Sequence, residues 1–131
     1  MIKEDIIYEQ LNIFYQSHVQ ILGEKSTRLY IQEKLNGKLN EEIVETVDDG
    51  GSAFDFIPII EGLGAAVSLI SVIIEIVKLV KGDKPKEEKK DIPQIIILIK
   101  QKVKEKGLSE EINLPDDDIL KEMVAHIEKN S

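Results

Sequence analysis

An almost unbroken run of aliphatic side chains occupies the middle of the chain, between Pro58 and Lys81. Six polar or small residues within it recur at steps of three and four, a spacing that gathers them on one narrow stripe of an α-helix. This stripe consists of Glu61, Gly64, Ser68, Ser71, Glu75 and Lys78. Because proline is tolerated in the first turn of a helix, the pattern predicts a long apolar helix from Pro58 to Lys81.

The stripe has two interpretations. Gly64, Ser68 and Ser71 resemble a contact line between helices, where small side chains let two backbones approach closely. In water, the more common explanation is that polar residues collect on the face of the helix that solvent reaches. We therefore treat the stripe as a candidate interaction surface and expect all other sides of the helix to be covered.

The segments before the apolar helix are less regular. Residues 3–22 carry apolar side chains at helical spacing and end at Gly23, which predicts an amphipathic helix. Residues 26–49 are ambiguous. Asn36-Gly37 between two mixed runs favours a β-hairpin, and the β-branched residues of the second run agree with it. The rival is two short helices, Thr27 to Leu35 and Glu41 to Val47, with Asn36-Gly37 ending the first.

The C-terminal third begins with a charged segment without aliphatic side chains, residues 82–91 up to Asp91, which predicts an exposed linker. Asp91 and Pro93 then open a predicted helix that ends before Gly107, although the opening run PQIIILI could also form a strand. Pro115 and the following aspartates predict a final helix.

Together these elements predict an α+β fold that is mostly helical. It contains an N-terminal helix, a β-hairpin, the long apolar central helix and a C-terminal pair of helices; the alternative is an all-α bundle. Residues 1–81 are expected to form a core unit, residues 82–91 a charged linker, and residues 92–131 a helical segment that packs on the core.

Composition narrows the function classes. The chain has 131 residues, with 25 acidic and 17 basic side chains and a net charge of −8. Such a charge repels a phosphate backbone, and no basic stripe offsets it, so nucleic acid is excluded as a partner. The absence of cysteine removes thiolate chemistry and disulfides and agrees with a reducing compartment. The N-terminus lacks the pattern of a secretion signal, so we expect a cytoplasmic protein.

No motif indicates catalysis or a cofactor. His18 and His126 each lie in an amphipathic segment without a second ligand at metal-binding spacing. Gly62 to Val67 imitates the start of a dinucleotide fingerprint, but the third small position is a valine. We therefore expect neither an enzyme nor a bound cofactor or metal.

The functional expectation follows from the apolar helix. We expect a soluble, non-catalytic interaction or self-association protein that binds a second copy or another protein. The alternative is a protein that inserts the same helix into a membrane under some conditions. Its longest uncharged run, from Gly62 to Ile74, is shorter than the roughly twenty residues that a span needs, so membrane insertion is possible but not expected.

Overall fold

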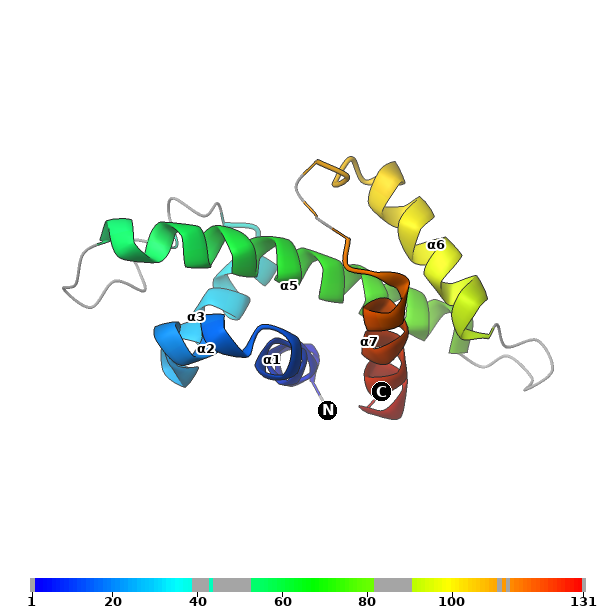
Figure 1. The fold of residues 1–131 in the computed structure, drawn as a ribbon, viewed down its shortest axis with the longest axis horizontal. Coiled ribbons are helices and arrows are strands. Elements are labelled where there is room, and N and C mark those ends of the chain that lie inside the picture. Colours follow the sequence, from blue (N-terminus) through cyan, green and yellow to red (C-terminus); the bar gives the residue numbers. More distant parts are fainter. Residues whose placement is uncertain are drawn as a thin grey trace. The chain divides into compact units, whose positions relative to one another are not determined.

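The computed structural model describes residues 2–38, 43, 53–81, 91–110, 112 and 114–130 (Figure 1). Within these ranges the chain forms helices and no strand. The helices are α1 (Lys3–Phe14), α2 (Gln16–Leu22), α3 (Glu24–Leu35), α5 (Ala53–Lys81), α6 (Ile92–Glu105) and α7 (Asp117–Asn130). The fold is therefore all-α, as in the alternative that the sequence left open, and the α+β prediction is wrong.

The predicted hairpin is replaced by α3 over its first strand. Thr27, Tyr30 and Ile31 are buried and lie three and four residues apart, which is the spacing of one helix face. The Asn36-Gly37 pair ends this helix instead of forming a hairpin turn. Gly37 has a φ of 86°, and the amides of Gly37 and Lys38 donate to the carbonyls of Lys34 and Glu33, both at 3.1 Å. This is a Schellman cap. Of the second predicted strand, residues 39–47, only Ile43 belongs to the described part of the chain.

The predicted N-terminal helix is divided into α1 and α2. Tyr15 separates them with φ −132° and ψ 41°, values outside the helical region. No glycine or proline marks this position, so the break could not be predicted from the local sequence.

The described helices belong to two compact units, residues 2–67 and residues 68–131. The N-terminal half of α5 belongs to the first unit and its C-terminal half to the second. In the first unit, α1, α2 and α3 pack against one another. Tyr30 is fully buried there, and its hydroxyl donates a hydrogen bond of 2.9 Å to the Ile60 carbonyl of α5. Burial raises the pKa of Tyr30 well above its ordinary value.

Charged side chains join α1 to α3 at the surface of this first unit. The Arg28 guanidinium lies 2.9 Å from Asp5 and 3.2 Å from Glu4, and it also stacks on the Tyr8 ring with 4.3 Å to the ring centroid. The hydrogen bond to Asp5 is the main cause that raises the pKa of Arg28. Three carboxylates, including Glu24 at 3.4 Å, and an aromatic face hold this side chain in one place.

In the second unit, α6 and α7 pack against each other, and each buries one face. The buried residues are Ile95, Ile96, Ile99 and Val103 on α6, and Leu120, Met123, Val124 and Ile127 on α7. Asp91 caps α6 as predicted: its side chain accepts from the Gln94 amide, while the Gln94 side chain accepts from the Asp91 amide. At the other end, Gly107 closes a second Schellman cap. The predicted linker lies outside the described residues except for Asp91 and stays a prediction.

Candidate functional site

The stripe predicted on the apolar helix lies on the side of α5 that is least covered. Glu61, Glu75 and Lys78 are exposed, Ser68 and Ser71 are half-buried, and Gly64 is buried. The other sides of the helix are closed; for example, the side chains Leu69, Ile70, Val72, Ile73, Ile74 and Val77 are at most 2% exposed. The period of three and four thus located the exposed side of the helix, while a binding role for the stripe stays a prediction.

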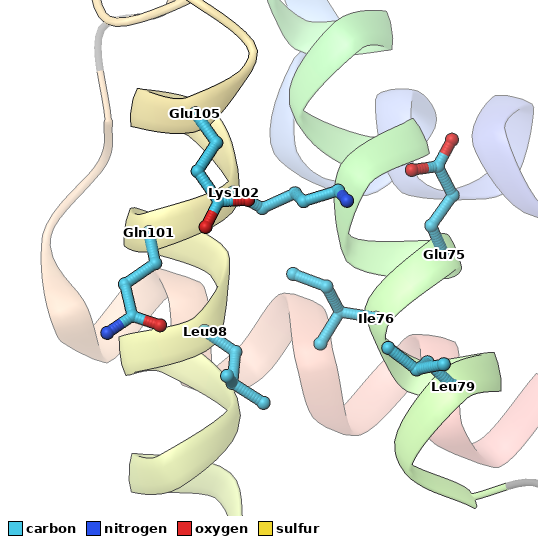
Figure 2. A pocket seen from close by; sticks show the side chains of 7 residues that line it. All are labelled: Glu75, Ile76, Leu79, Leu98, Gln101, Lys102 and Glu105. Carbon is cyan, nitrogen blue, oxygen red and sulfur yellow. The ribbon is translucent and has the colours of Figure 1, made fainter.

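Beside the stripe, a groove opens between α5 and α6 within the second unit (Figure 2). It has a volume of about 370 Å³. Its lining consists of Glu75, Ile76 and Leu79 from α5 and Leu98, Gln101, Lys102 and Glu105 from α6. Glu75 is therefore the one member of the predicted stripe that lines this groove.

Helical spacing explains why these side chains face one another. On α5, Leu79 follows Glu75 by four residues, and on α6, Lys102 follows Leu98 by four, so each pair lies on one side of its helix. The side of α6 that carries Ile95, Ile99 and other buried aliphatics faces the core instead. The groove is thus the surface left between two helices whose apolar faces are packed elsewhere.

The groove has an apolar floor and an apolar edge. Ile76 is only 4% exposed and extends from α5 toward α6, whereas Leu79 is 72% exposed (Figure 2). Leu98 of α6 is half-buried. No other exposed large aliphatic side chain in the described part of the chain is as exposed as Leu79. Single exposed aliphatic residues are common on protein surfaces, and Leu79 differs from them because it lies beside the apolar floor of a groove.

The charged residues of the groove are of two kinds. Glu75 forms an ion pair of 3.0 Å with Lys106, and since both side chains are about 40% exposed, the pair contributes only about 0–1 kcal/mol. Lys102 and Glu105 form no ion pair within the described residues. Figure 2 shows the Lys102 side chain extending from α6 toward α5. As far as the described residues go, the groove therefore offers one unpaired cation and one unpaired anion on the same helix.

Within the described residues, no group of three or more histidine, aspartate or glutamate side chains could hold a metal ion. His18 of α2 lies over Gly62 of α5, where a β-carbon would be 3.1 Å from its Nε2 atom. This contact belongs to the packing of the first unit and explains why a residue without a side chain suits position 62.

The α5 helix also has the length and composition of a membrane span over Ile59–Lys81, but 67% of its most apolar window is buried inside the protein. A core helix of a soluble protein meets the same criteria. The apolar character of α5 therefore does not distinguish between a membrane helix and a buried one.

Sequence reasoning missed the α6 side of the groove. A usable signal was present in the run Ile95 to Ile99, which places aliphatic side chains on every side of a helix. One helix face cannot bury all of them, and Ile97 is indeed 57% exposed. The surplus shows that α6 cannot bury all of its aliphatic side chains, and one of this run, Leu98, lines the groove.

Comparisons with other proteins add no functional information: no protein-family model, no curated protein and no solved structure matches this chain. The geometry of the groove is therefore the basis for assigning a function.

Proposed function

We propose that this chain is a non-catalytic protein-interaction module, and that the groove between α5 and α6 is its binding surface. The observation that carries the proposal is the pairing of a buried apolar floor, Ile76, with the strongly exposed Leu79 at its edge. A partner that inserts aliphatic side chains would remove Leu79 from water and cover the floor. Helices that lay an apolar face into a groove are a common form of such recognition.

The apolar side chains of this surface would contribute favourably to binding. Complete burial of one leucine side chain is worth about 1.5–3 kcal/mol, and Leu79 is largely exposed in the free protein. Leu98 on α6, which also lines the groove and is half-buried, supplies further apolar surface. Association itself costs about 4–15 kcal/mol in lost translational and rotational freedom, so a stable contact needs several such side chains to be buried together.

The alternative function, insertion of α5 into a membrane, has less support. The helix would have to withdraw most of its apolar surface from the two units, because 67% of the relevant window is buried. The interaction function needs no such rearrangement, since the groove is open in the folded chain.

A displayed library of amphipathic helical peptides tests the proposed function. We expect the wild-type protein to select binders that lose at least about tenfold in affinity toward Leu79→Asp, because a charge at the edge opposes burial of an aliphatic side chain. Ile21→Asp is the matched control: Ile21 is 59% exposed but belongs to α2 and does not line the groove. The selected peptides should bind Ile21→Asp with the same affinity as the wild type. A library that yields no binder sensitive to Leu79→Asp contradicts the proposal.

A further inference from the structure

We propose that the occupant of the groove is a second copy of this chain, in a two-fold arrangement in which each groove faces the other. This inference rests on the proposed function and adds the identity of the partner. In a two-fold contact the same surface meets itself, so every residue pair across the interface occurs twice. The surface must therefore be complementary to itself in both charge and shape.

The charges of the groove meet this requirement. Lys102 and Glu105 lie one helical turn apart on α6, carry opposite charges, and have no ion partner in the described part of the chain. When two copies of α6 meet antiparallel, Lys102 of each copy lies opposite Glu105 of the other. Two intermolecular ion pairs then form where the single chain has none.

The groove is also electrically neutral, unlike the chain as a whole. Glu75 is neutralised by Lys106, and Lys102 balances Glu105. The whole chain has a net charge of −8, so two copies repel each other over most approaches. The electrostatic cost of bringing two such chains together is lowest at a neutral surface. A strongly basic or strongly acidic partner would gain little from it.

The apolar residues complete the match. In the two-fold arrangement the exposed Leu79 of each copy covers the apolar floor around Ile76 of the other copy. Both copies thereby remove their most exposed aliphatic side chain from water. The same exchange buries two leucines at once, which doubles the apolar gain that a partner with a single anchor would supply.

Charge reversal with mixing tests this arrangement directly. Sedimentation equilibrium of the full chain, from micromolar to millimolar concentration, should show dimerisation of the wild-type protein. Lys102→Glu and Glu105→Lys should each weaken it at least about tenfold, because each variant places like charges opposite each other twice. An equal mixture of the two variants should recover dimerisation to within about threefold of the wild-type value, since the mixed pair restores opposite charges.

Lys104→Glu is the matched control. Lys104 is exposed on the same helix but does not line the groove, and the substitution changes the net charge by the same amount as Lys102→Glu. We expect it to leave dimerisation unchanged. Helical circular dichroism of every variant should match the wild type, because both groove positions are solvent-accessible.

A wild-type chain that stays monomeric throughout the concentration range overturns this inference. A dimer that ignores both charge reversals, or a mixture that fails to recover, also overturns it. The peptide library separates the two proposals: binders sensitive to Leu79→Asp together with a monomeric chain leave the interaction function standing with a foreign helix as the occupant. Failure of both experiments removes both proposals.

Discussion

The buried hydroxyl of Tyr30 allows a quantitative test of the first unit. The Tyr30 side chain is fully buried, and its hydroxyl donates to the Ile60 carbonyl at 2.9 Å, which connects α3 to α5. Tyr30→Phe removes this hydrogen bond and keeps the ring in place. The substitution therefore measures the contribution of the Tyr30 hydroxyl, whose hydrogen bond to Ile60 joins α3 to α5.

We expect Tyr30→Phe to lower the free energy of unfolding by about 1 kcal/mol at pH 7, the net value of one intramolecular hydrogen bond. The loss stays moderate because Ile60 lies inside α5, where its carbonyl also accepts the helical hydrogen bond. The ring continues to fill its site, so no cavity term is added.

The difference in free energy of unfolding between the wild type and Tyr30→Phe should depend on pH. Burial raises the pKa of Tyr30 in the folded chain, whereas in the unfolded chain this tyrosine titrates near pH 10. Above that pH the unfolded state binds fewer protons than the folded state, so the stability of the wild type falls as pH rises. At pH 11 this effect costs the wild type about 1.4 kcal/mol, and the phenylalanine variant does not incur it. The deficit of the variant should therefore disappear, or reverse, at pH 11.

Urea unfolding followed by circular dichroism at pH 7 and pH 11 measures both values. Tyr8→Phe is a suitable control, because it removes a hydroxyl from a half-buried tyrosine in the same unit. Tyr15, whose pKa is also raised by burial, titrates in both proteins and cancels in the comparison. A deficit below about 0.3 kcal/mol at pH 7, or one that stays constant to pH 11, would refute the reasoning.

Three further substitutions address other parts of the fold. Thr27→Val should raise the free energy of unfolding by about 0.5–1 kcal/mol, because the buried Thr27 hydroxyl has no hydrogen-bond partner within the described residues and valine has the same shape. If urea unfolding instead shows a decrease of the same size, the hydroxyl forms a hydrogen bond in solution. Gly62→Ala should fall short of the gain of about 1 kcal/mol usual in a helix interior, because its β-carbon would lie 3.1 Å from His18. In the His18→Ala background the full gain should return, and a double-mutant cycle with no coupling contradicts this contact. Asp91→Ala removes the N-terminal cap of α6 and should lower the free energy of unfolding by about 1 kcal/mol, with faster amide hydrogen exchange in the first turn of α6. Unchanged exchange in that turn would count against the capping box.

The sequence predicted the helices that carry strong local signals. The stripe along α5 has a regular period, and α6 begins at a residue, Asp91, whose side chain can cap a helix and which is followed by Pro93. These signals act within a few residues of the chain, so they do not depend on tertiary contacts. The exposed side of α5 could be derived from them for the same reason.

The wrong prediction of a hairpin has an identifiable cause. Asn-Gly suits both a two-residue β-turn and the left-handed residue that closes a helix, because glycine adopts a positive φ without strain in either case. The choice depends on what the preceding residues pack against. Here Tyr30 of α3 reaches the backbone of α5, a contact between segments far apart in the chain that no local pattern reports.

The groove was only half predictable. Glu75 belongs to the regular stripe of α5 and was found from its spacing. The side contributed by α6 was hidden, because a run of consecutive isoleucines and leucines has no polar positions to show which side is exposed. The surplus of aliphatic residues could have been noticed, but the surface they occupy becomes visible only when α7 has covered the opposite face.

The continuity of α5 has a consequence for dissecting this protein. The boundary between its two compact units falls between Val67 and Ser68, in the interior of an uninterrupted helix. Cutting the chain there would sever the backbone hydrogen bonds that span the boundary and leave each unit with a shortened helix whose new end has unsatisfied backbone groups. We therefore expect neither half to survive alone as a folded fragment, and heat to melt the pair in a single transition.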